Sequence, residues 1–168
     1  MANETWDDNQ FPLAYLITIR TYGTWLHGDE RQSVDRHGKN VFGTERISAN
    51  ADLIAKMEAN ARFEPFFLNA EQRSAVDNAV RSVCSTRKYV LLAVNVRSNH
   101  LHAVVTAPAK PEPIMNAFKA NATRELRASG LVRLEQTIWS RGGSRRYLWK
   151  DNEVARAVDY VRYDQGED

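Results

Sequence analysis

The feature that most constrains the fold is a pair of β-rich runs near the middle of the chain, 89–96 and 101–106. Both runs are rich in Val, Leu and Ala, and only four residues, Arg97-Ser98-Asn99-His100, separate them. So short a polar connection predicts an antiparallel hairpin. Segments with helical periodicity lie before the hairpin at 69–86 and after it at 114–129.

The remaining elements complete a mixed α and β pattern. Residues 11–20 predict a strand, short strands at 137–140 and 147–149 flank a turn at 141–144, and 152–163 predict a last helix. The order is therefore strand, helix, two strands, helix, short hairpin, helix. It predicts an α+β fold of the ferredoxin-like class, an antiparallel sheet with helices packed on it.

Capping residues and apolar stripes define the helices and their buried faces. Asn69, with Gln72 three residues later, predicts the cap of the first helix, and Asn152 predicts that of the last. The side chains that we expect to be buried recur at helical spacing. They are Val76, Val80 and Val83 in the first helix, Met115, Phe118, Ala122 and Leu126 in the second, and Val154, Ala157, Val158 and Val161 in the last.

The bulk composition is that of one globular domain, spanning 1–168, because 43% of the residues are hydrophobic and 26% are charged. Within it we expect a loose tail at 1–10, a long loop insertion at 21–50 and a short helix at 51–60. The single cysteine, Cys84, allows no intrachain disulfide and is expected in the core. Neither a signal peptide nor an apolar run of membrane-spanning length is recognisable, so we expect a soluble, cytoplasmic protein with no membrane partner.

Two histidines, His100 and His102, open the second strand of the hairpin. Side chains alternate between the faces of a strand, so both imidazoles point to one face and Leu101 points to the other. Two imidazoles on one face can form a pair of metal ligands. Histidines on a strand are more often solvated or packed, so the pair by itself does not establish a metal site.

The stretch from Val96 to Val105, VRSNHLHAVV, resembles the HUH strand (His, hydrophobic, His) of the single-tyrosine transposases. That family includes the insertion-sequence transposases that act on single strands and the REP-associated tyrosine transposases. Its members usually have Pro where this chain has Ser98. The resemblance implies an HUH-type ferredoxin-like fold, single-stranded or hairpin DNA as the partner, and a homodimer.

The resemblance also implies a nucleophilic tyrosine on a later helix, with a polar metal ligand about one turn beyond it. Tyr160, followed by the hydrophobic Val161, matches this pattern, and Tyr163 is the competing nucleophile. Where the family has Asn or Gln four positions after the tyrosine, this chain has Asp164, and Gln165 follows. Residues i and i+4 share a helix face, so Asp164 can approach the same metal, with Gln165 as the alternative. The opposing interpretation makes Tyr160 a packed aromatic beside the apolar stripe.

A site of this kind predicts a DNA-nicking and joining enzyme. Under the resemblance, His100, His102 and Asp164 or Gln165 hold one Mg²⁺ or Mn²⁺ on the scissile phosphate. Tyr160 attacks that phosphate, forms a 5′-phosphotyrosine link and releases a 3′-hydroxyl. A different 3′-hydroxyl then reverses the reaction and joins two strands.

Basic residues are concentrated in the same half of the chain, since residues 111–150 hold eight Lys and Arg against three Glu. The segment 139–149 interleaves aromatic, arginine and glycine residues, a composition that suits nucleic-acid bases and phosphates. Trp139 and Trp149 are nevertheless expected to pack into the core. The side chains predicted to contact DNA are Lys119, Arg124, Arg127, Arg141, Arg145 and Arg146.

Two alternatives remain open. A host-adapted descendant would bind single-stranded or hairpin DNA with weak or no cleavage; Asp164 in place of the usual amide motivates it, and intact His100, His102 and Tyr160 argue against it. A sheet-faced RNA-binding module would stack bases on aromatic strand residues and would need no histidine pair. A metal requirement separates the nicking enzyme from the RNA-binding module.

Overall fold

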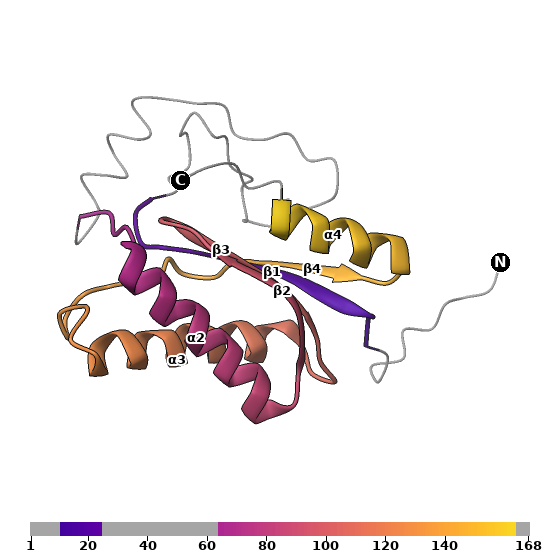
Figure 1. The fold of residues 1–168 in the computed structure, drawn as a ribbon, viewed down its shortest axis with the longest axis horizontal. Coiled ribbons are helices and arrows are strands. Elements are labelled where there is room, and N and C mark those ends of the chain that lie inside the picture. The colour runs from indigo at the N-terminus through magenta and orange to yellow at the C-terminus, as the bar shows by residue number, and fades with distance from the viewer. Residues whose placement is uncertain (1–10, 25–63, 164–168) are drawn as a thin grey trace, which may run out of the picture.

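A four-stranded antiparallel sheet with the strand order β2-β3-β1-β4 runs through the centre of the molecule (Figure 1). The structure is a computed structural model that describes residues 11–24 and 64–163. The expected tail, most of the expected loop insertion, the expected helix at 51–60, and Asp164 with Gln165 lie outside the described residues. The described elements are β1 (Ala14–Arg20), α2 (Ala70–Arg87), β2 (Val90–Val96), β3 (His100–Thr106), α3 (Pro111–Ala128), β4 (Ser144–Leu148) and α4 (Asp151–Tyr163).

Helices cover both faces of this sheet. The two helices that connect strands, α2 and α3, lie on one face, and α4 lies on the other (Figure 1). The β2–β3 hairpin occupies one edge, while β1 pairs with both β3 and β4. Two crossover helices on one face of an antiparallel sheet with this strand order define the ferredoxin-like α+β class, as the sequence predicts.

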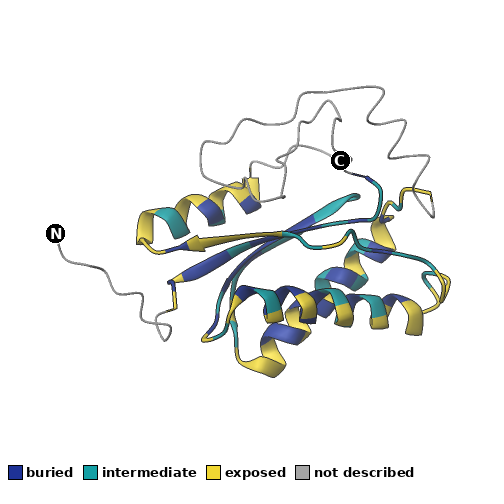
Figure 2. Ribbon diagram, turned by 180° about the vertical axis from the view of Figure 1, so that it is seen from behind, coloured by how far each residue is buried: buried dark blue, intermediate teal, exposed yellow. Residues whose placement is uncertain are grey.

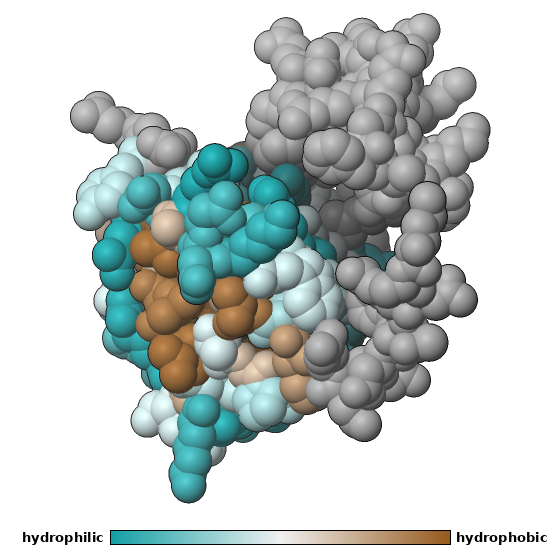
Figure 3. Space-filling view, turned by 90° about the vertical axis from the view of Figure 1, so that its right-hand side faces the viewer, coloured by the Kyte–Doolittle hydropathy of each residue, from teal (hydrophilic) through white to brown (hydrophobic). Residues whose placement is uncertain are grey.

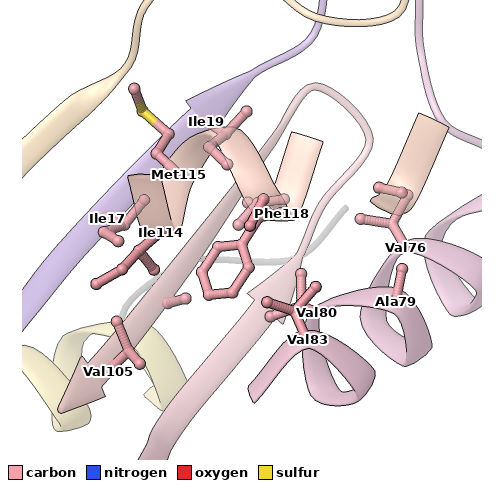
Figure 4. Close-up of a cluster of buried hydrophobic side chains, with 14 of the residues drawn as sticks. Ile17, Ile19, Val76, Ala79, Val80, Val83, Val105, Ile114, Met115 and Phe118 are labelled. Atoms are coloured by element: carbon pink, nitrogen blue, oxygen red, sulfur yellow. The ribbon is translucent and has the colours of Figure 1, made fainter. Parts of the chain in front are cut away.

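The larger hydrophobic core lies between the sheet and the pair α2 and α3, whose inner sides are buried (Figure 2). Alternate residues of β1 point into it, with Tyr15, Ile17 and Ile19 no more than 1% exposed. Side chains from the sheet and from both helices meet around Phe118, which is fully buried (Figure 4). The predicted stripes of both helices are confirmed as core, and so is Cys84, which is 3% exposed.

The first turn of α2 is closed by the predicted cap. The Asn69 side chain accepts a hydrogen bond from the Gln72 backbone N–H at 2.9 Å, and the Gln72 side chain accepts one from the Asn69 N–H at 2.8 Å. This reciprocal pair satisfies two N–H groups that the helix itself cannot pair. The helix ends at Arg87 and is capped by Lys88, which adopts a left-handed conformation with φ of 58°.

The other two helices begin earlier than the sequence predicts. Helix α3 starts at Pro111 and not at residue 114, because proline at the first helical position has its φ already set and lacks an N–H that would need a partner. Helix α4 starts at Asp151, so Asn152 is inside the helix and is not its cap. Instead the Glu153 carboxylate accepts hydrogen bonds from the backbone N–H groups of Trp149 at 2.8 Å and Lys150 at 3.1 Å.

The hairpin predicted around 141–144 is wrong. Trp139 forms a bridge with Thr21, the residue just after β1, and β4 then pairs with Ala14–Thr18 of β1. The two segments therefore follow one another along the edge of β1 and do not pair with each other. Residues 141–143 interrupt this edge strand. A glycine-containing turn between two short β-rich runs has the same local sequence pattern whether the two runs pair with each other or both pair with a third strand. The sequence therefore does not distinguish these two arrangements.

A smaller hydrophobic cluster lies between the sheet and α4. Ala157 and Val161 are buried there, while Val154 and Val158 are partly buried, which confirms the predicted stripe.

Seen from the right-hand side of Figure 1, hydrophobic side chains form one patch bordered by hydrophilic ones (Figure 3). Among the described residues, no helix is both long and apolar enough to cross a membrane.

Candidate active site

A row of polar residues crosses the sheet on the face that α4 covers. Antiparallel register places Asn95 of β2 opposite His102 of β3, His102 opposite Thr18 of β1, and Thr18 opposite Ser144 of β4. We call these four residues the polar row. His100 is two residues before His102 and shares its face, whereas Leu101 is buried in the larger core, as the alternation predicts.

The two imidazole rings lie edge to face, with their centroids 4.7 Å apart. His100 Nδ1 is 2.6 Å from the side-chain oxygen of Asn99, which can only accept a hydrogen bond, so His100 Nδ1 carries the proton. His102 Nδ1 is 2.7 Å from the Thr18 hydroxyl, and both of these side chains are buried. Each ring is thus held through Nδ1 by a neighbouring oxygen.

Tyr160 lies against the histidine pair. Its ring centroid is 5.4 Å from that of His102, and 42% of the residue is exposed to solvent. The structure therefore brings together three predicted site residues from two separate elements. Tyr160 is not enclosed in the packed stripe, contrary to the opposing interpretation. Tyr163 is more exposed, at 74%.

The C-terminal end of α4 is attached to β2 by two side chains. The Asn95 amide donates to the Val161 carbonyl at 3.1 Å, and the Arg162 guanidinium donates to the Leu92 carbonyl at 3.1 Å. Carbonyls in the last turn of a helix lack partners within the helix, so the Asn95 bond satisfies one of them. Because Val161 follows Tyr160 directly, this bond attaches the turn of α4 that carries the tyrosine to β2.

The chemistry of the donors fits a divalent metal. A ligating histidine normally donates its second ring N–H to an oxygen, and the Asn99 contact gives His100 that arrangement, in which the lone pair is on Nε2. Within 11–24 and 64–163, no three His, Cys, Asp or Glu side chains gather closely enough to hold a metal ion. A third ligand from Asp164 or Gln165 would belong to the residues just beyond the described end of α4.

Two other potential nucleophiles are excluded by burial. Burial raises the pKa of Tyr15 to about 12, with smaller contributions from Tyr147 and Glu112. Burial also raises the pKa of the Cys84 thiol to about 11. Both groups are protonated at neutral pH and point into the larger core, so neither is a candidate for covalent chemistry.

The predicted DNA-contacting residues fall in separate places. Arg124 and Arg127 line a groove of about 780 Å³ along α3, on the opposite side of the sheet from the histidines. Lys119 lines it as well, but its ammonium donates to the Ser140 carbonyl at 2.9 Å and to the Gly142 carbonyl. Lys119 therefore secures the interruption in the edge strand.

The arginines of β4 point to opposite faces. Arg145 lies on the α3 side and forms an ion pair with Glu112 at 3.2 Å. Arg146 has the same strand parity as Leu148, which packs under α4, so it shares the face of the polar row. Arg141 is exposed in the interruption. The structure thus separates six residues that the sequence grouped together.

The two tryptophans also differ from each other. Trp139 packs against the larger core, and its indole N–H bonds to the Lys119 carbonyl at 3.2 Å and to the Thr123 hydroxyl at 3.0 Å, as expected. Trp149 is 42% exposed and stacks on Tyr147, with an interplanar angle of 9°. The expectation of a core position is therefore wrong for Trp149, because it follows the outermost strand.

Thr18 and Asn95 were not identified from the sequence. Each is a polar residue inside an otherwise apolar strand, which is the one local signal that marks them. That signal does not say which face or which partner is involved. Asn95 faces His102 across the β2–β3 hairpin, whereas the contact of Thr18 with His102 follows from the pairing of β1 with β3, which are far apart in the sequence.

Comparison with known proteins agrees with this geometry. The family described as Transposase IS200 like matches residues 59–162, which is more than half of the chain. The chain therefore belongs to the IS200-like transposase family, as the sequence resemblance predicts, and its function is transposase-like.

Among solved structures, a REP-associated tyrosine transposase bound to a REP hairpin matches with a TM-score of 0.49 and 13% identity, covering 96% of this chain and 70% of that one. No curated protein matches.

Proposed function

We propose that the chain is a metal-dependent endonuclease and strand transferase for single-stranded DNA, with Tyr160 as its nucleophile. The observation that carries this proposal is the contact between the Tyr160 and His102 rings, whose centroids are 5.4 Å apart although the residues come from different elements. His100, His102 and a third ligand, Asp164 or Gln165, would hold Mg²⁺ or Mn²⁺. The bound ion would withdraw charge from the scissile phosphate.

The tyrosine carries out the covalent step. Its hydroxyl oxygen attacks phosphorus and loses its proton, the bond from phosphorus to the 3′-oxygen breaks, and that oxygen takes up a proton to leave as a 3′-hydroxyl. The 5′ end of the DNA is then linked to Tyr160. Attack by another 3′-hydroxyl reverses these changes and joins two strands. The solvent exposure of Tyr160 supports access by a flexible single strand.

Two basic regions would bind the DNA backbone. Arg146 lies on the face of the polar row and would contact phosphates near the cleavage position. Arg124 and Arg127, in the groove along α3, would bind a more distant part of the strand or a hairpin. Arg141 would add a contact from the interruption in the edge strand. Arg145 pairs with Glu112, Lys119 with the Ser140 carbonyl and Arg124 with the Asn121 side chain, so these three would have to exchange a protein partner for DNA.

Adduct formation tests the proposal. Single-stranded oligonucleotides are incubated with the full chain and Mn²⁺, and a denaturing gel detects covalent protein–DNA adducts. Wild type is expected to form an adduct that Tyr160→Phe abolishes and Tyr163→Phe retains. An adduct that survives in Tyr160→Phe and disappears in Tyr163→Phe moves the nucleophile to Tyr163. DNA binding without any adduct overturns cleavage and favours the non-cutting descendant.

The two neighbouring arginines of β4 provide a matched pair for the DNA surface. Arg146→Ala should weaken oligonucleotide binding more than Arg145→Ala, because only Arg146 shares the face of the polar row. Arg146→Ala should also make binding depend less steeply on salt concentration. Equal effects of the two substitutions on oligonucleotide binding would contradict the proposal that DNA binds on the face of the polar row. The expected homodimer stays a prediction, which sedimentation equilibrium of the full chain tests directly.

A further inference from the structure

Thr18 occupies a special position relative to His102. It is 6% exposed and lies directly opposite that histidine in the β1–β3 pairing, with its hydroxyl 2.7 Å from Nδ1. We propose that Thr18 is a positioning residue that fixes the ring orientation and the tautomer of His102, so that Nε2 is presented to the metal. This inference rests on the metal-dependent function proposed above.

The tautomer of His102 determines which atom donates the hydrogen bond between Nδ1 and the Thr18 hydroxyl. In a neutral imidazole one nitrogen carries the proton and the other carries a lone pair. If Nδ1–H donates to the Thr18 oxygen, Nε2 has the lone pair and can coordinate a metal. If the threonine hydroxyl donates to Nδ1, Nε2 carries the proton and cannot coordinate. A threonine hydroxyl can donate or accept; we infer the first arrangement, because it leaves on Nε2 the lone pair that a metal ligand needs and matches His100, where the Asn99 oxygen requires a proton on Nδ1.

The surroundings make this hydrogen bond effective. Both partners are buried, His102 being 7% exposed, and a hydrogen bond in such an environment is stronger than one in water. Threonine is β-branched, so its hydroxyl is held in few rotamers and the strand pairing fixes its position. The ring of His102 is also in contact with Tyr160, so a rotation of the imidazole would disturb both the ligand and the nucleophile.

A purely structural role leads to a different expectation. If Thr18 only satisfies a buried nitrogen, its removal lowers stability and leaves the tautomer and the metal affinity unchanged. If Thr18 positions the ring, its removal changes both. Thr18→Val keeps the shape and deletes the hydroxyl, and Thr18→Ser keeps the hydroxyl. Thr106→Val is a matched control. Thr106 is on the same strand as His102, and its hydroxyl donates to the Leu13 carbonyl at 2.7 Å.

Two measurements on the full chain decide between these roles. Nitrogen-15 NMR of the imidazoles reports the tautomer of His102, and electron paramagnetic resonance of free Mn²⁺ reports metal affinity. Wild type, Thr18→Ser and Thr106→Val should show Nδ1–H and similar affinity. Thr18→Val should lose the single tautomer and bind Mn²⁺ about 10-fold to 100-fold more weakly, the range typical for loss of such a partner.

The outcomes separate this inference from the function on which it rests. A His102 ring with the proton on Nε2 in wild type, or a Thr18→Val variant with unchanged tautomer and affinity, overturns the positioning role. Wild type that binds no Mn²⁺ at all contradicts the metal-dependent function and with it the presentation of Nε2 to a metal. In that case the NMR signals still establish whether Thr18 sets the tautomer.

Discussion

The two faces of the sheet are built differently although they share the same strands. On the face toward α2 and α3, β1 contributes Tyr15, Ile17 and Ile19, all essentially buried in one large core. On the face toward α4, the same strand contributes Leu16 to a small cluster and Thr18 to the polar row. Because side chains alternate along a strand, residues on one face build the larger core while residues on the other face form the polar row.

Because the larger core lies on the face toward α2 and α3, we expect that face to contribute most of the free energy of unfolding. Phe118→Ala should lower the free energy of unfolding by about 3–5 kcal/mol, because it opens a cavity in the larger core. Thermal or urea unfolding measures this change. Phe67→Ala is the control, since Phe67 is 58% exposed and its loss should have little effect. Similar losses in both variants would contradict the placement of Phe118 in the larger core.

Gly143 lies close to Met115 of the larger core and to the backbone of Thr18, so its substitution should affect both the core and the polar row. A Cβ on Gly143 would lie against the Met115 sulfur and 2.8 Å from the Thr18 carbonyl oxygen, so Gly143→Ala should lower stability by about 2 kcal/mol through overpacking.

Because the strain reaches Thr18, the Gly143→Ala variant should also bind Mn²⁺ more weakly. Gly130→Ala is the comparison: its φ of 69° makes alanine unfavourable by about 1–2 kcal/mol, but nothing lies within 4 Å of the added carbon. Unfolding should show a loss of stability in both variants. Mn²⁺ titration should show a loss of affinity in Gly143→Ala alone.

Asn95→Ala tests the attachment of α4. The variant leaves the Val161 carbonyl without its side-chain donor, so stability should fall by about 1 kcal/mol. Adduct formation should fall by a larger factor than stability explains, because the hydrogen bond lies next to Tyr160. Asn78→Ala, on the exposed side of α2, should change neither. An adduct yield that follows stability alone would argue against a positioning effect of Asn95.

The smallest expected effect concerns the start of α4. Hydrogen bonds from the backbone N–H groups of Trp149 and Lys150 hold the pKa of Glu153 below its ordinary value of 4.5. A carboxyl whose pKa is lowered in the folded state stabilises it above the unfolded pKa, and this contribution disappears as the pH falls through the folded pKa. Helix α4 should therefore loosen in acid.

Amide exchange or circular dichroism between about pH 6 and pH 2 detects this loosening, and Glu153→Gln should show a flatter dependence on pH than wild type. An unchanged pH profile in Glu153→Gln would show that other carboxyls control it.

Features that depend on neighbouring residues were predictable from the sequence. The hairpin, the Asn69 cap and the shared face of His100 and His102 all follow from spacing along one segment. The pairing of β4 with β1 did not follow, because it joins residues more than a hundred positions apart. For the same reason the sequence placed Arg145 and Arg146 together as DNA contacts, whereas strand alternation sends them to opposite faces.

The histidines and the tyrosine belong to parts of the molecule with different local stability. His100 and His102 are in β3, which has a paired strand on each side, while the buried side chains of α4 are Ala157 and Val161. Elements with few buried contacts open at a lower free energy than the core. Amide exchange should therefore be faster around Tyr160 than around the histidines. Engineering a more heat-resistant core would leave this difference in place, and only added contacts beneath α4 would reduce it.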